Sequence, residues 1–184
     1  MARGQRIFQS AWVFAGGLAL VTFALAANGH AEDRALVADG KLSVEIPDGW
    51  NETDLNAGRT VAGWATGDNR TSAFFVRFPA GGGSMRELID GTIANFDEAF
   101  DLRKESKPKT GQVDGPGDEK WPAIFKTLEG YVEKGERQHE MRFYLLIFDV
   151  GSNLYLMQAT TTIPVRDVRE RQIYEFIRSI IARP

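Results

Sequence analysis

Three consecutive β-rich segments near the end of the chain constrain its fold more than any other feature. They cover residues 123–132, 138–150 and 154–161, and turns of only a few residues separate them. Short turns between long β-rich segments predict an antiparallel meander, because parallel neighbours need a crossover of a dozen or more residues. The middle segment carries apolar or aromatic side chains on both of its faces. These are Met141, Phe143, Leu145 and Ile147 on one face and Tyr144, Leu146 and Phe148 on the other. We therefore expect this segment at the centre of a sheet that is covered on both sides.

Further strands are predicted upstream of the meander. Residues 42–46 alternate between apolar and polar side chains, and the Pro-Asp-Gly turn at 47–49 ends that strand. Residues 60–65 and 72–78 are also β-rich, and the Gly-Asp-Asn sequence at 67–69 lies between them. Glycine and asparagine tolerate positive φ, so this pair is predicted to form a hairpin.

Two amphipathic helices are predicted. The first begins after Ser84, which forms a Ser-x-x-Glu capping box with Glu87. Its apolar residues recur at helical spacing: Met85, Leu88, Ile89, Ile93, Phe96 and Phe100. The second is predicted to open at Pro164, with an inward stripe formed by Val165, Val168, Ile173, Phe176, Ile177 and Ile180. Residues 103–120 are polar and contain Gly and Pro, so we expect an extended edge and an exposed loop there. The expected fold class is α+β: an antiparallel sheet with helices on both faces, that is, an α/β/α sandwich.

The first 31 residues have the features of a secretory signal peptide. Arg3 and Arg6 precede an uncharged apolar stretch over 11–27, and small residues at Gly29 and Ala31 suit a signal peptidase. We predict cleavage near Ala31, which leaves a single domain over 32–184. This mature domain is expected in the periplasm and without a membrane span. The alternative is an uncleaved anchor helix, but 17 mostly apolar residues are fewer than the roughly 20 that span a bilayer.

Composition excludes several classes of function. The net charge of −3 becomes about −5 once the two leader arginines are removed, and this balance argues against a nucleic-acid partner. The sequence contains no cysteine, which excludes disulfides, a lipidated N-terminal cysteine, thiolate chemistry and cysteine-ligated metals. Stability must therefore come from packing.

His139 is the one histidine that survives the predicted cleavage. A histidine-based nucleophile or a zinc site needs an acid, a nucleophile or further ligands nearby. The residues on the same strand face, Arg137 and Met141, supply none of these. We expect His139 to be an exposed strand residue.

Other polar clusters have ordinary structural explanations beside the functional ones. The glycine-rich segment 81–84 precedes a helix and could bind an anion, yet it lacks the Lys-Ser/Thr pair of a phosphate loop. The acidic cluster within 114–119 could bind calcium, but its spacing does not match a calcium loop. Asp97 and Asp101 are expected four residues apart on one helical face, where they decorate the surface rather than flank a cleft.

The three tryptophans of the predicted mature chain either line a ligand groove or fill the core; they are Trp50, Trp64 and Trp121. The sequence thus predicts no catalytic residue, no cofactor-binding residue and no metal ligand, and the protein is expected not to be an enzyme.

The order of elements resembles the PsbP/DcrB-like superfamily over roughly residues 36–183. An Ile-Pro-Asp-Gly-Trp motif at 46–50 ends the first strand, and the last helix finishes with Phe-Ile-Arg-Ser-Ile at 176–180. The resemblance implies an α/β/α sandwich and a non-enzymatic binding or accessory protein of the cell envelope, with an envelope protein as partner. Bacterial members that give the superfamily its name are lipoproteins, and the missing cysteine departs from that pattern. The alternative function is a periplasmic carrier of a small apolar ligand or lipid, suggested by the aromatic content and the two apolar faces of the central strand.

Overall fold

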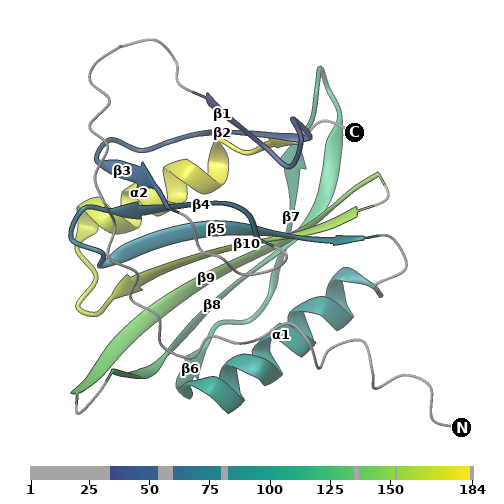
Figure 1. The fold of residues 1–184 in the computed structure, drawn as a ribbon. Helices are drawn as coiled ribbons and strands as arrows, with labels where there is room; N and C mark the ends of the chain where they lie inside the picture. The colour runs from purple at the N-terminus through teal and green to yellow at the C-terminus, as the bar shows by residue number, and fades with distance from the viewer. Residues whose placement is uncertain (1–33, 54–59, 80–82, 135–136, 152, 183–184) are drawn as a thin grey trace, which may run out of the picture.

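The computed structural model describes residues 34–53, 60–79, 83–134, 137–151 and 153–182. The predicted leader, including its cleavage point near Ala31, lies outside these residues. The described part of the chain is an α+β domain with two helices and one 11-stranded mixed sheet (Figure 1). Neither of these helices combines the length and the apolar character that crossing a membrane requires.

The predicted meander is confirmed and forms the middle of the sheet. Its strands are β8 (Lys120–Lys134), β9 (Arg137–Val150) and β10 (Asn153–Thr162). Both neighbouring pairs are antiparallel, with Ile147 of β9 opposite Ile124 on one side and Leu156 on the other. Few residues separate these strands along the chain, so each strand pairs with the one that precedes it.

The other strands extend the sheet from both edges of the meander. Beyond β10 lie β5 (Thr71–Pro79), β4 (Thr60–Thr66) and β3 (Trp50–Glu52), all antiparallel to their neighbours. Beyond β8 lie β7 (Lys109–Asp114), β11 (Ile181–Ala182), β2 (Leu42–Glu45) and β1 (Arg34–Val37). The β4–β5 hairpin and the β2 strand are as predicted, and Asn69 in the hairpin turn has a φ of 53°. The sheet is mixed because β11 runs parallel to β7.

Residues 103–120 are more regular than the sequence suggests. They contain β7 and most of β6 (Asp101–Glu105), and both strands pair with the long strand β8. Only the turn between β7 and β8 matches the predicted exposed loop; there the Gly115 amide donates to the Glu119 carbonyl over 2.9 Å. The extended conformation is as expected, but β7 is not an edge, because it lies between β8 and β11. Most side chains of both strands are polar, so backbone pairing with β8 contributes more to their position than an apolar face does.

Helix α1 (Met85–Ala99) begins as predicted. The Ser84 hydroxyl accepts from the Glu87 amide over 3.2 Å, and the Glu87 carboxylate accepts from the Ser84 amide over 2.7 Å. This complete capping box satisfies amides that a helix start otherwise leaves unpaired.

Helix α2 spans Asp167–Arg178, three residues later than predicted. Pro164 does not open the helix: it follows a cis peptide bond with Ile163 in the segment that leaves β10. The predicted inward stripe is correct for Ile173 and Phe176, which are fully buried, but wrong for Val168, which is 46% exposed. Val168 lies in the first turn of the helix.

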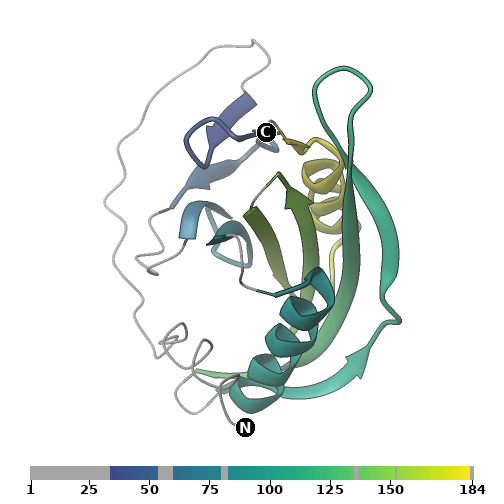
Figure 2. The same cartoon turned by 90° about the vertical axis from the view of Figure 1, so that its right-hand side faces the viewer.

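The apolar side chains form two separate clusters. Along β9, Tyr144, Leu146 and Phe148 belong to a cluster with α2, whereas Phe143, Leu145 and Ile147 belong to a cluster with α1. Alternate residues of a strand point to opposite faces, so the central strand is buried on both faces, as its sequence predicts. The long strands are strongly curved, and the two helices are well separated in both views (Figures 1 and 2).

Candidate functional site

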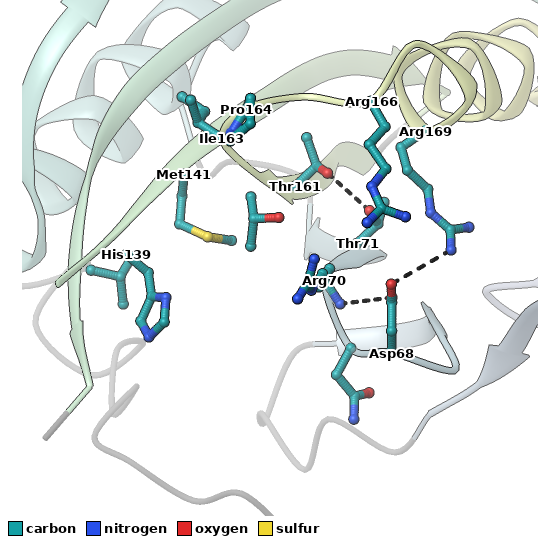
Figure 3. A pocket seen from close by; sticks show the side chains of 13 residues that line it. Asp68, Arg70, Thr71, His139, Met141, Thr161, Ile163, Pro164, Arg166 and Arg169 are labelled. Carbon is teal, nitrogen blue, oxygen red and sulfur yellow. Dashed lines mark hydrogen bonds and ion pairs between the residues drawn. The ribbon is translucent and has the colours of Figure 1, made fainter. Parts of the chain in front are cut away.

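A groove of about 740 Å³ opens where five segments meet at one end of the sheet. The segments are the β4–β5 turn, the end of β8, the start of β9, the end of β10 and the chain leading into α2 with its first turn. We call it the arginine groove. It is lined by Asp68, Asn69, Arg70, Thr71, Val132, His139, Met141, Thr161, Thr162, Ile163, Pro164, Arg166 and Arg169 (Figure 3).

The β4–β5 turn positions Arg70 through a set of short-range hydrogen bonds. The Asp68 carboxylate accepts from the Thr66 hydroxyl over 2.6 Å and from the Arg70 amide over 3.2 Å. These two bonds, the Thr66 one most strongly, lower the pKa of Asp68, and the nearby charges of Arg169 and Arg70 act in the same direction. Asp68 is therefore a fixed anion: its Oδ1 accepts both hydrogen bonds of the turn, and its Oδ2 lies 3.8 Å from Arg169.

Two buried threonines join β5 and β10 beneath the groove. The hydroxyls of Thr71 and Thr161 are 2.9 Å apart, and both residues are almost inaccessible. They face each other in the β5–β10 register, so the sheet holds this pair in place. The result is a small polar strip between the two walls of the groove (Figure 3).

The chain between β10 and α2 forms the next part of the wall. The Thr162 amide donates to the Arg70 carbonyl over 3.1 Å, and the Ile163 amide donates to the Glu140 carbonyl over 2.8 Å. These backbone bonds fix the segment that carries Ile163 and Pro164 against the ends of the neighbouring strands. Arg166 follows as the residue that precedes α2.

Arg166 and Arg169 are three residues apart and lie on one side of the start of α2. Arg169 is partly satisfied: it donates to the Gln172 side chain over 3.0 Å and lies 3.8 Å from the Asp68 carboxylate. Arg70 and Arg166 are exposed, and their guanidinium groups form no ion pair or side-chain hydrogen bond with any described residue. The groove thus carries three guanidinium groups against one carboxylate, on a chain whose net charge is negative.

The opposite wall is largely apolar. Met141 and His139 extend from the start of β9, and Val132 lies opposite His139 in the β8–β9 register. In Figure 3 the arginines gather near α2 and the hairpin turn, whereas Met141 and His139 lie across the opening from them. Chemically, this arrangement offers one cationic end, one apolar end and hydroxyl groups between them.

A second, smaller hollow of about 170 Å³ lies beside β6 and contains a network of paired charges. Arg142 forms an ion pair with Glu129 at 2.7 Å and another with Glu170 at 3.0 Å. The Tyr144 hydroxyl donates to Glu170 over 3.0 Å, and burial raises the pKa of Tyr144 above its ordinary value. Because these charges are paired with one another, we assign this network to the attachment of α2 to the sheet.

His139, which the sequence singles out for possible chemistry, lines the groove. It is exposed, as expected, and its neighbours on that wall are Val132 and Met141 rather than carboxylates. Among the described residues, no group of three or more His, Cys, Asp or Glu side chains is placed to hold a metal ion.

The polar clusters that the sequence offers as alternative sites lie elsewhere. Asp114 is paired with Lys120 at 2.5 Å, and the Glu87 carboxylate occupies the start of α1, where an anion would otherwise bind. The expectation that Asp97 and Asp101 share a helical face is wrong. The helix ends at Ala99, and Asp101 lies in β6, where it pairs with Arg103.

The tryptophans contribute to the core rather than to the groove. Trp50 and Trp64 are buried, and each ring centre lies 5.7 Å from that of Phe176. Trp121 packs against the same cluster, and its indole nitrogen has no hydrogen-bond partner among the described residues. None of the three lines the arginine groove.

Sequence reasoning does not find the arginines of the groove. They come from a hairpin turn and from the start of a helix about a hundred residues later, and neither stretch carries a large net charge. The available signal is weak: cations next to the predicted Gly-Asp-Asn turn and beside Pro164.

Solved structures with the same architecture include proteins of very different sequence. Cyanobacterial PsbP (CyanoP) from Synechocystis matches with a TM-score of 0.53 at 12% identity, over 87% of this chain and 98% of its own. The chain has a PsbP-like fold. LpqN, described as involved in cell envelope biogenesis of Mycobacterium tuberculosis, has a TM-score of 0.51 at 12% identity, over 78% of this chain and 83% of its own.

A protein from Bacteroides thetaiotaomicron shares the PsbP-like fold, with a TM-score of 0.52 at 14% identity over 82% of this chain. The match covers 48% of that protein, so the chain spans about half of its length. No family model matches the sequence, and no curated protein matches it either. At these identities the likeness concerns the fold, and function has to be argued from the site itself.

Proposed function

We propose that this chain is an exported, non-enzymatic accessory protein of the cell envelope that binds its target in the arginine groove. In this proposal the two helices cover the two faces of the PsbP-like sheet, as in an α/β/α sandwich, and leave the end of the sheet free for binding. The observation that carries the proposal is the pair of exposed guanidinium groups, Arg70 and Arg166, beside a groove and without a partner among the described residues.

The chemistry of the groove supports binding rather than catalysis. Guanidinium groups stay protonated, so Arg70, Arg166 and Arg169 can hold an anion but cannot act as general bases at ordinary pH. Asp68 is already ionised and hydrogen-bonded, and the hydrogen bond from Thr66 lowers its pKa further. Proton transfer near neutral pH is most efficient from a group whose pKa lies near 7, and Asp68 is displaced away from that value.

The leader and LpqN support the envelope location. A predicted signal peptide precedes the domain, and LpqN, whose fold matches that of this chain, is described as involved in cell envelope biogenesis. Fractionation of cells that express the full sequence tests this part. We expect the protein in the envelope fraction with an N-terminus near Glu32; retention of an intact protein in the cytoplasm would contradict the location.

Site-specific photocrosslinking tests the role of the groove. A photoreactive amino acid replaces His139 in one variant and Arg171 in the other. His139 is exposed and lines the groove without being one of its arginines, and Arg171 is an exposed residue of α2 outside the groove wall. We expect a discrete adduct from position 139 in intact cells and none from position 171. Equal adducts from both positions, or none from either, would contradict binding in the groove.

A second candidate function is that of a carrier for a small apolar ligand or lipid. The apolar wall formed by Val132, Met141 and Ile163 favours it, and a volume of about 740 Å³ lies within the range of ligand pockets, roughly 300–1,000 Å³. Native mass spectrometry of protein purified from the envelope tests this function. A co-purified small molecule is expected if it is a carrier, and a bare protein mass would count against it.

A further inference from the structure

We propose that the ligand of the arginine groove is a small amphipathic anion: one carboxylate or phosphate group joined to an apolar body. This inference rests on the proposed binding role of the groove and adds the chemical class of the ligand. It follows from the separation of charge and apolar surface between the two walls (Figure 3).

The cationic wall determines the head group. Arg70 and Arg166 have no acidic partner among the described residues, whereas Arg169 is already shared between Gln172 and Asp68. A planar guanidinium can donate two parallel hydrogen bonds to a carboxylate or a phosphate, which favours these anions over a halide or a neutral polar group. Arg70 and Arg166 are therefore the two groups that we expect to bind the head.

Asp68 does not neutralise this wall. Its carboxylate accepts from the Thr66 hydroxyl and from the Arg70 amide, and it also lies 3.8 Å from Arg169. Its negative charge interacts with Arg169 and, more weakly, with Arg70, so one carboxylate faces three guanidinium groups and a net positive charge remains for the ligand. The hydroxyls between the walls, such as that of Thr162, can donate to remaining anionic oxygens.

The apolar wall determines the rest of the ligand. Met141 and Ile163 lie across the opening from the arginines in Figure 3, and Val132 lines the groove opposite His139 in the β8–β9 register; these side chains present hydrocarbon and thioether surface. A free inorganic anion would leave this surface wet, whereas an alkyl or aromatic body would bury it and gain the hydrophobic contribution. A methionine side chain is flexible and adapts to irregular apolar groups, so the wall does not demand one rigid shape.

The size of the groove suits a ligand of this kind. Its volume of about 740 Å³ is that of a site for a small organic molecule rather than for a bare ion. The same chemistry could be supplied by a free acid or by the head and first carbons of a lipid, and the probes below separate these sources.

Binding to the protein expressed from the full sequence is measured by calorimetry with four probes below their micelle concentrations. These are octyl phosphate, octanoate, inorganic phosphate and the neutral octyl glucoside. We expect the two amphipathic anions to bind. The affinities for inorganic phosphate and octyl glucoside should be lower by about tenfold or more, since charge-assisted hydrogen bonds and the apolar body each contribute to binding. Vesicles with anionic lipids then test the membrane-bound source, which is supported only if they compete with octyl phosphate.

Three variants locate the site. Arg70→Gln and Arg166→Gln are each expected to lower the affinity for octyl phosphate by about tenfold. Met141→Gln is expected to lower the same affinity without changing the response to inorganic phosphate. Arg171→Gln is the matched control and is expected to bind like the unchanged protein. All four positions are at least partly exposed, and far-ultraviolet circular dichroism verifies that each variant folds.

Several outcomes would overturn the inference. Equal affinity for octyl glucoside and octyl phosphate would remove the role of the arginines, and equal affinity for inorganic phosphate would remove the role of the apolar wall. An equal loss in Arg171→Gln would show a non-specific charge effect. If none of the probes binds but position 139 still gives a discrete crosslink to a protein, the proposed function stands and the amphipathic ligand does not.

Discussion

The attachment of α2 to the sheet gives the sharpest test of the packing described above. Phe176 is fully buried in the contact between α2 and the sheet. The centre of its ring lies 5.7 Å from that of Trp50, 5.7 Å from that of Trp64 and 5.9 Å from that of Phe75. Replacing Phe176 with Ala removes the whole ring from a site that three other large side chains cannot easily fill. We expect a loss in the free energy of unfolding of about 4 kcal/mol, within the usual 3–5 kcal/mol for this change.

The expected loss is measurable by thermal and denaturant unfolding. For a domain of roughly 150 residues, 1 kcal/mol corresponds to about 2–4 °C in Tm, so Phe176→Ala should melt roughly 10 °C lower. The milder Phe176→Leu variant should lose about 1–3 kcal/mol, and it keeps the test valid if the alanine variant does not fold. Because α2 also carries Arg169 and directly follows Arg166, the groove should lose its ligand affinity at a lower temperature in both variants.

The same helix provides the control. Val168 is 46% exposed in the first turn of α2, so Val168→Ala should change the free energy of unfolding by less than about 0.5 kcal/mol. A loss of under about 1 kcal/mol in Phe176→Ala, or an equal loss in Val168→Ala, would refute the assignment of Phe176 as the anchor of the helix.

Three further predictions concern the strands, α1 and alkaline stability. Gly130→Ala should destabilise by about 1–3 kcal/mol, because a Cβ there would lie 2.9 Å from the backbone oxygen of Asp101. Gly111→Ala, where a Cβ meets nothing within 4 Å, should be neutral or slightly stabilising. Denaturant unfolding of both variants tests this, and equal effects of the two changes would contradict the prediction. Ser84→Ala should lower the free energy of unfolding by about 1 kcal/mol through loss of the helix cap, whereas Ser84→Asp should retain most of the stability that the cap contributes. A loss that Asp does not rescue would argue against capping. Burial raises the pKa of Tyr144, so the neutral phenol stabilises the fold fully below the unfolded pKa of about 10, and this contribution decreases as the pH rises above it. Stability measured between about pH 9 and 11 should therefore fall less steeply in Tyr144→Phe, and parallel curves would contradict this.

The elements that the sequence predicts correctly are those with a local and periodic signal. The three-strand meander has short turns and two apolar faces on its middle strand, and the α1 capping box is complete within four residues. The sequence places the start of α2 three residues too early because proline is common at the first turn of a helix. Here Pro164 instead follows a cis peptide bond before the helix begins.

The strands whose bounds and pairing the sequence does not indicate have no such local signal. β6 and β7 are polar and exposed along most of their length, and pairing with the long strand β8 holds them. The two residues of β11 form a strand only because the chain returns between β2 and β7. Nothing in a short window of sequence reports the presence of such a distant partner.

The sequence by itself determined the class of this protein: an α+β domain whose central strand is buried on both faces, without cysteine and preceded by a predicted leader. It also yielded the likeness to PsbP, because that likeness depends on the order of elements along the chain. Only the tertiary structure decided where a ligand could bind. Arg70, Arg166 and Met141 belong to three segments far apart in the sequence, and the ends of β5, β9 and β10 bring them to one groove. Strand register sets which distant side chains converge, and register is fixed by pairing between strands rather than by the composition of any one of them.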